Sequence, residues 1–217
     1  MAMSLTMMGA VLVNELDDIL ARASAAIEEK FFRLPIDGGE PVFRERVYCY
    51  ELYHQMRVLW TSNEFTLNGE VDKRGHALLR RLGLRLASPD FLIHSPGSMN
   101  GNHAVIEVKH TLAADDIEKD LQTLRSFVAV AGYARAIYLV FGCPDTQKVI
   151  TKIASVNATL DEHHVPVELW LHESIGTSAR CCYVLTPSVD RGPAAKEKTG
   201  EHFPSVSTRR PRRKTAY

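Results

Sequence analysis

The sequence contains three charged residues that the geometry of β-strands can bring together into a chemical site: Asp90, Glu107 and Lys109. Asp90 precedes a short apolar run, and Glu107 and Lys109 end a second apolar run that follows a turn-rich loop at 95–102. Two such runs joined by a loop predict a β-hairpin. Side chains alternate across a strand, so Glu107 and Lys109 share one face. If the hairpin pairs symmetrically about its loop, Asp90 lies directly opposite Glu107.

The two opposed carboxylates predict a site for a divalent metal ion. Like charges that face each other across a hairpin destabilise it unless something neutralises them. Mg²⁺ prefers oxygen ligands, commonly takes one or two carboxylates, and keeps waters that phosphate oxygens can replace. Lys109, a flexible point charge, would stabilise a phosphate or orient a water. These groups predict metal-dependent hydrolysis of a phosphodiester bond, with Mg²⁺ as the cofactor and Mn²⁺ as its substitute.

A Pro-Asp pair that ends at Asp90, followed after 16 intervening residues by Glu107-Val108-Lys109, resembles the PD-(D/E)XK nuclease superfamily. Its members share the restriction-endonuclease-like fold. The resemblance implies an α/β protein with an α-β-β-β-α-β core, in which helices flank a mixed central sheet. It also implies a magnesium-dependent endonuclease in which Asp90, Glu107 and Lys109 are catalytic and the backbone carbonyl of Val108 completes the metal shell. With the Glu-Val-Asp-Lys at 70–73, the pattern is similar to a group of small bacterial nuclease-like proteins.

An additional acid is expected on a helix ahead of the sheet. Residues 41–60 predict a helix whose apolar stripe includes Glu51. The other members of this stripe are Val47, Tyr48, Leu52, Gln55, Val58 and Leu59. An acid aimed inward costs free energy unless it is paired or bound to a metal. The resemblance implies a catalytic role for Glu51, and an ordinary partner such as Arg44, Arg57 or a tyrosine hydroxyl is the alternative.

Two further segments offer competing polar ligands. The strand that follows the predicted helix would, if it continues, place Glu70 and Asp72 on one face. Glu70 is therefore a second candidate for the additional metal ligand. In the helix predicted over 113–130, the resemblance implies a polar residue near the metal, and both Asp120 and Gln122 are candidates.

The remaining patterns predict that helices and strands alternate along the chain. The near-continuous apolar run at 135–142 is typical of a strand covered on both faces. The other predicted elements are helices over 14–32, 73–84 and 144–160 and strands over 64–73, 165–171 and 181–185. Helices mixed with strands in this order favour an α/β fold.

The chain divides by composition into three parts. Its 217 residues are 45% hydrophobic and 24% charged, as in a globular protein. We expect an N-terminal helical segment at 1–40, a nuclease-like domain at 41–188 and a disordered basic tail at 189–217. From residue 191 onward the tail holds eight of the 26 lysines and arginines but two of the 26 acids, so the rest of the chain is acidic. The candidate nucleic-acid-binding residues of the tail are Arg209, Arg210, Arg212, Arg213 and Lys214. A merely solubilising tail is the alternative.

Composition also indicates the cellular setting. No apolar run approaches the roughly 20 residues of a membrane span, and the N-terminus lacks the basic start of a signal peptide. The four cysteines lack zinc-ligand and Cys-x-x-Cys spacing, so buried free thiols in a reducing cytoplasm are expected. We therefore expect a cytoplasmic protein, without membrane contact, whose partner is nucleic acid, DNA more than RNA. A homodimer or a partner protein is compatible with its size, and a role in defence or in a mobile element follows from the resemblance alone.

Two functions from other classes remain open. One is a nuclease-like fold that binds nucleic acid or a partner subunit without catalysis, as happens on many folds. The other is a structural α/β domain whose basic tail tethers it to nucleic acid or to an acidic partner.

Overall fold

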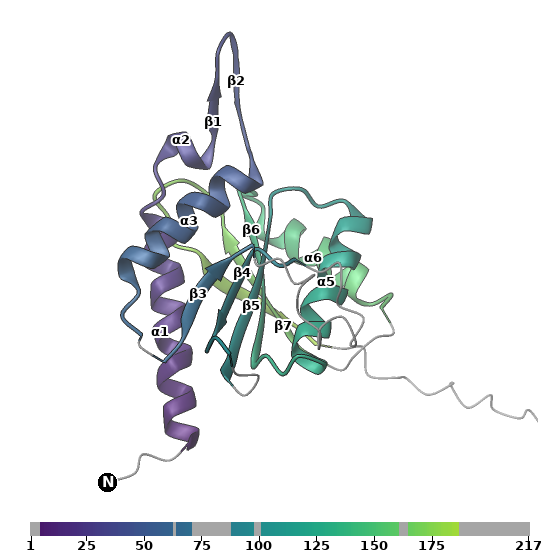
Figure 1. The fold of residues 1–217 in the computed structure, drawn as a ribbon. Coiled ribbons are helices and arrows are strands. Elements are labelled where there is room, and N and C mark those ends of the chain that lie inside the picture. Colours follow the sequence, from purple (N-terminus) through teal and green to yellow (C-terminus); the bar gives the residue numbers. More distant parts are fainter. Residues whose placement is uncertain (1–4, 63, 71–87, 98–100, 161–164, 187–217) are drawn as a thin grey trace, which may run out of the picture.

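The computed structural model describes residues 5–62, 64–70, 88–97, 101–160 and 165–186, with side chains from residue 15 onward. Its centre is a mixed six-stranded sheet with the strand order β3-β4-β5-β6-β7-β8 (Figure 1). The strands are β3 (Thr66–Gly69), β4 (Phe91–His94), β5 (Asn102–Lys109), β6 (Arg135–Phe141), β7 (Val167–His172) and β8 (Arg180–Leu185). Three antiparallel strands, β3 to β5, are followed by β6 and β7, which run parallel to β5, and β8 pairs antiparallel with β7.

The predicted register of the central hairpin is confirmed. Phe91 pairs with Ile106, and Ile93 pairs with Ala104, so the strands are symmetrical about their loop over most of their length. A shift in register occurs next to the loop, after Ile93. The same register, extended by one residue beyond the first residue of β4, places Asp90 opposite Glu107. A one-residue slip would turn Glu107 into the apolar core that Ile106 and Val108 occupy.

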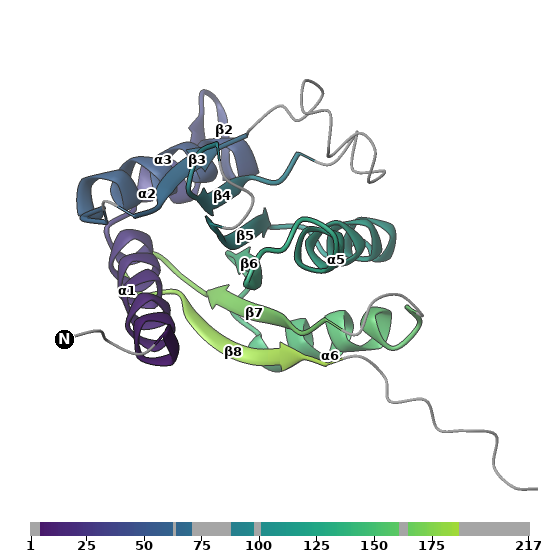
Figure 2. The same cartoon turned by 60° about the horizontal axis from the view of Figure 1, so that its bottom comes forward.

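Helices cover both faces of this sheet, as predicted for a mixed α/β fold. One face packs against α1 (Leu5–Ala25), α2 (Glu29–Phe32) and α3 (Glu45–Leu59), and the other against α5 (Ala114–Ala129) and α6 (Thr146–Asn157) (Figures 1 and 2). The order α3-β3-β4-β5-α5-β6 matches the predicted helix, three-strand meander, helix and strand.

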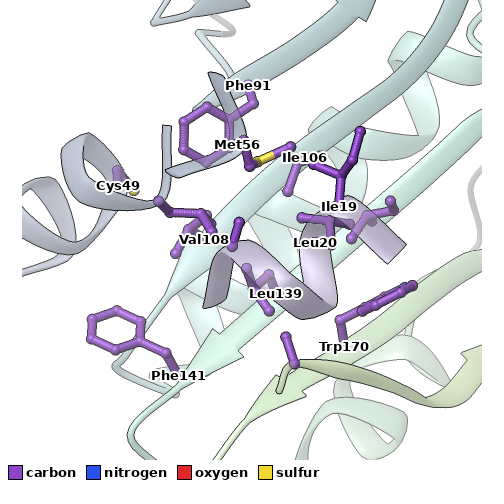
Figure 3. Packing of buried hydrophobic residues seen from close by; sticks show 14 of the residues in the cluster. Ile19, Leu20, Cys49, Met56, Phe91, Ile106, Val108, Leu139, Phe141 and Trp170 are labelled. Carbon is purple, nitrogen blue, oxygen red and sulfur yellow. The ribbon is translucent and has the colours of Figure 1, made fainter. Parts of the chain in front are cut away.

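Strand β5 shows how alternation positions the candidate site. Ile106 and Val108 are buried in the core beneath α1 and α3, close to Cys49 and Met56 of α3 (Figure 3). Because alternate residues point to opposite faces, Glu107 extends to the face that α5 covers. The predicted separation of the charged face from the apolar face of this strand is therefore confirmed.

The helix predicted over 41–60 begins later, at Glu45, because a β-hairpin that was not predicted precedes it. This hairpin comprises β1 (Leu34–Ile36) and β2 (Gly39–Val42), which pair antiparallel and project from the body above α3 (Figure 1). An Asp-Gly turn joins them, with Gly38 at φ +70°. Asp-Gly between extended segments is a strong hairpin signal, because the turn needs positive φ.

The buried stripe of α3 is also rotated relative to the prediction. Tyr48, Cys49, Leu52 and Met56 are buried, whereas Val58 is 68% exposed. The prediction that included Val58 in the stripe was therefore wrong. The buried residues follow the four-residue spacing that stacks side chains on one helix face.

The other predicted elements fall into three groups. The single helix predicted over 14–32 is divided into α1 and α2, while α5, α6 and the strands β6 to β8 lie where the pattern predicts them. The strand predicted over 64–73 ends at Gly69. The helix predicted over 73–84, Asp72 and the basic tail lie outside the described residues.

Two predictions on composition can be compared with the described structure. Cys49 is buried, but Cys143 and Cys182 are partly exposed and Cys181 is exposed, so the expectation of buried thiols holds for Cys49 alone. Among the described residues, no helix combines the length and the apolar character that crossing a membrane requires.

Candidate functional site

Asp90 is held against β5 by its own carboxylate. The residue lies immediately before β4, and its Oδ2 accepts a hydrogen bond of 2.7 Å from the backbone N–H of Val108. Strand β4 begins at Phe91, one residue after Asp90. At this point the side chain of Asp90, and not a backbone carbonyl of β4, accepts the hydrogen bond from β5. The backbone carbonyl of Asp90 accepts a bond of 2.9 Å from the N–H of Glu70 at the end of β3. Two strands thus fix the position of this carboxylate.

Glu107 is buried and faces the partly exposed Asp90, so the two acids form a pair, as the hairpin register predicts. Glu107 is 7% exposed, and burial followed by the negative charges of Asp90 and Asp120 raises its pKa well above the usual value. Burial also raises the pKa of Asp90, although the Val108 N–H and Lys109 act in the opposite direction. The interaction between the two carboxyl groups lowers the pKa of Asp90 and raises the pKa of Glu107. The pair therefore favours neutralisation, by a proton or by a bound cation.

Lys109 is fixed between acids from the two faces of the sheet. Its Nζ lies 3.7 Å from Oε2 of Glu45 in α3 and 3.6 Å from Oδ2 of Asp120 in α5. Partial burial lowers the pKa of Lys109, but Asp120 and Glu45, together with the acid pair, outweigh burial and leave the pKa raised. The ammonium is therefore charged at neutral pH and positioned beside Glu107.

The structure distinguishes between the two candidates on α5. Asp120 is buried, pairs with Lys109, and accepts a hydrogen bond of 3.4 Å from the hydroxyl of Tyr138. Burial raises the pKa of Asp120 to about 6, against the opposing effect of Lys109. Gln122 instead donates to Glu118 at 3.4 Å on the outer side of the helix. Asp120 therefore belongs to the candidate site.

Glu45 is a site residue that the sequence prediction missed. Its Oε1 accepts a hydrogen bond of 3.1 Å from the N–H of His110, and its Oε2 pairs with Lys109. A signal for it exists in the sequence, since Glu45 lies on the same helical face as Cys49 and Met56, at spacings of four and eleven residues. The prediction missed Glu45 because the buried face of α3 is rotated relative to the predicted stripe, which included Glu51 and Val58.

The two acids predicted to assist the pair have other partners. Glu51 is half-buried and accepts a hydrogen bond of 2.7 Å from Gln55, one turn further along α3. Glu70 is exposed and pairs with Arg46 at 3.4 Å. β3 ends at Gly69, and Glu70 directly after it adopts a positive φ of 34°. The structure therefore brings Glu45, rather than Glu51 or Glu70, to Lys109.

The donors around the acid pair fit a hard metal ion that keeps much of its water. Within the described residues, no three side chains of His, Cys, Asp or Glu gather into a metal-binding group. The oxygens available are the carboxylates of Asp90 and Glu107 and the carbonyl of Val108. The N–H and C=O of one strand residue point to the same side, so this carbonyl faces the side on which Asp90 lies. An oxygen-only set with two carboxylates suits Mg²⁺ or Mn²⁺.

The whole cluster contains four carboxylates and one ammonium at the end of β5. Asp90 enters from the start of β4, Glu107 and Lys109 from β5, Glu45 from α3 and Asp120 from α5. Such a cluster can bind a divalent cation and hold a cationic side chain beside it.

Comparison of the chain with protein-family models, with curated proteins and with solved structures found no match.

Proposed function

We propose that the protein is a magnesium-dependent nuclease with a restriction-endonuclease-like fold of the PD-(D/E)XK type, which hydrolyses phosphodiester bonds in nucleic acid, DNA in preference to RNA. The observation that supports this proposal is the hairpin register that sets Asp90 beside Glu107, with Lys109 on the same strand. An ordinary surface hairpin with a solvated charge pair does not account for it, because Glu107 is buried and its pKa is raised. Raised pKa values of two neighbouring acids are common at functional sites.

In this proposal Asp90, Glu107 and the carbonyl of Val108 hold the metal. Held there, a divalent metal would supply a water of lowered pKa and positive charge to offset that of the phosphate. Lys109 stabilises the phosphate or orients the attacking water with a charge that its two flanking acids maintain. Glu45 and Asp120 act through Lys109, because each places a carboxylate beside its Nζ from a different face of the sheet.

The direct test is cleavage of labelled single- and double-stranded DNA and RNA by the purified protein. We expect cutting with Mg²⁺ or Mn²⁺ and none with EDTA, and we expect DNA to be cut faster than RNA. An Asp90→Asn variant purified in parallel is the control for contaminating nucleases, since asparagine retains an acceptor for the Val108 N–H but removes the metal-binding charge. Cleavage that persists in EDTA, or that is equal in the variant, would refute the proposed metal assignment.

Glu45 and Glu51 provide a matched pair of variants on one helix. Glu45→Gln is expected to reduce the cleavage rate about 10-fold, because glutamine retains the bond from the His110 N–H but no longer offers a charge to Lys109. Glu51→Gln should stay within about twofold of the wild type, since its partner is Gln55. Single-turnover rates measure both effects. The reverse order of effects would restore Glu51 as the additional acid.

A noncatalytic nucleic-acid-binding or partner subunit is the second candidate function. The small number of candidate metal ligands favours this function. In the described part of the chain, the proposed metal site has two side-chain ligands, Asp90 and Glu107, in addition to the carbonyl of Val108. In that case the purified protein would bind nucleic acid without metal-dependent turnover. A homodimer belongs to the nuclease proposal, because cutting both strands of a duplex needs two such sites.

A further inference from the structure

We infer that Arg33, Arg44 and Arg46 form a phosphate-binding rim around the candidate site, and that they bind the DNA backbone on both sides of the scissile phosphate. This inference rests on the proposed nuclease function and extends it to how the substrate is held. The centre itself combines four carboxylates with one lysine, which leaves it acidic, and the chain outside the basic tail is acidic as well. Attraction of a polyanion to this centre therefore requires cations close by.

Arg46 lies on the side of the site where β3 and β4 meet. Its Nη2 is 3.4 Å from Oε1 of Glu70, and 70% of its side chain is exposed. The N–H of Glu70 donates to the carbonyl of Asp90, so Arg46 is connected to the acid pair through one residue. Exposed ion pairs contribute little free energy, and this guanidinium can therefore exchange the Glu70 carboxylate for a phosphate.

Arg33 lies on the opposite side of the site, toward β6. Its guanidinium carbon is 5.4 Å from the centroid of the Phe43 ring, and one N–H donates to the carbonyl of Pro41 at 3.2 Å. Phe43 stacks on His110 with ring centroids 4.0 Å apart, and His110 directly follows Lys109. Stacking on an aromatic ring orients the guanidinium, and arginine has five N–H donors, so donors remain for a phosphate.

Arg44 completes the rim beside Glu45. It is exposed, and no acidic side chain in the described part of the chain forms an ion pair with it. Arg33 directly precedes β1, and Arg44 follows β2 after Phe43, so both arginines lie at the base of the projecting hairpin (Figure 1). The three arginines thus lie at the base of one hairpin and in the first turn of α3, on the segment that also supplies Glu45 to the site.

The test measures DNA binding separately from cleavage. Binding of a fluorescent 20-base-pair duplex is followed by anisotropy in EDTA at several salt concentrations, with Arg33→Ala, Arg44→Ala and Arg46→Ala in the full-length chain. The matched control is Arg57→Ala, an exposed arginine about 18 Å from Glu45 along the axis of α3. The same set is repeated with the basic residues of the tail replaced by glutamine, which prevents tail binding from hiding the effect. An Arg33→Lys variant retains the charge and controls for the packing of Arg33 on Phe43.

Each rim variant is expected to weaken binding about 3- to 10-fold and to reduce the slope of log affinity against log salt by about 0.9, whereas Arg57→Ala changes neither. Rim variants that match Arg57→Ala, or an affinity that depends on the tail alone, would overturn the inference. An RNA duplex that binds more tightly than the DNA duplex would overturn the assignment to DNA. Absence of cleavage with rim-dependent binding intact would refute the nuclease and leave the rim standing, so the two failures can be told apart.

Discussion

Lys109→Met is expected to reduce metal-dependent cleavage by about 100- to 1,000-fold while the protein remains folded. Methionine retains a flexible apolar stem but removes the ammonium that lies 3.7 Å from Glu45 and 3.6 Å from Asp120. Since the charge is proposed to act on the phosphate or the attacking water, the loss should appear in the chemical step rather than in DNA binding. Single-turnover rates at saturating protein measure the chemical step directly.

Lys119→Met is the matched control for this prediction. Lys119 is exposed on α5, one residue before Asp120, and it also lowers the pKa of Asp120. Its replacement should change the cleavage rate by no more than about twofold. Circular dichroism establishes that both variants are folded. A Lys109→Met rate within about twofold of the wild-type rate, as for the control, would show that this ammonium has no part in the chemistry.

Glu107→Gln is expected to stabilise the protein at pH 8 by about 1 kcal/mol while it abolishes cleavage. Burial, followed by the charges of Asp90 and Asp120, raises the pKa of Glu107 in the folded state above its ordinary value of 4.5. A carboxyl of this kind adds stability that is fully present below pH 4.5 and is lost as the pH rises through the folded pKa. Glutamine is neutral throughout, so the variant should not suffer that loss. Urea unfolding at pH 4.5 and pH 8 measures the difference.

Magnesium should reverse the order of stability of these two proteins. A cation at 100 times its dissociation constant adds about 2.7 kcal/mol to the protein that binds it. We expect Mg²⁺ to raise the free energy of unfolding of the wild type and to leave Glu107→Gln nearly unchanged. The control is Glu118→Gln, an exposed change on α5 that should respond to Mg²⁺ as the wild type does. Equal stabilisation of all three proteins by Mg²⁺ would place the cation elsewhere.

Local pattern was sufficient to predict the central hairpin and its acid pair. Two apolar runs flank one turn-rich loop, and pairing them symmetrically about that loop gives the observed register from the sequence alone. Asp90 and Glu107 consequently lie together as expected. The alternation of helices with strands likewise predicted the mixed α/β class and the order of elements from α3 to β6.

The acids that pair with Lys109 could not be predicted from local sequence patterns, because tertiary packing brings them together. Glu45 and Asp120 lie on helices that pack on opposite faces of the sheet, and no sequence spacing relates them to Lys109. The helical pattern of α3 was ambiguous, because Glu51 and Glu45 both accompany apolar residues at helical intervals. Which acid reaches the site depends on how α3 is rotated about its axis, and the packing of its buried residues on the sheet sets that rotation.

The sequence by itself therefore determined the parts of the site that lie on one hairpin, since alternation and register are properties of neighbouring strands. Only the tertiary structure decided which acids surround Lys109 and which acid pairs with Arg46. Those choices depend on how α3 and α5 pack on the two faces of the sheet and on where the chain turns at Gly38 and Glu70. Packing brings together residues that are far apart in the chain, and periodicity in one segment carries no information about the partner that another segment will supply.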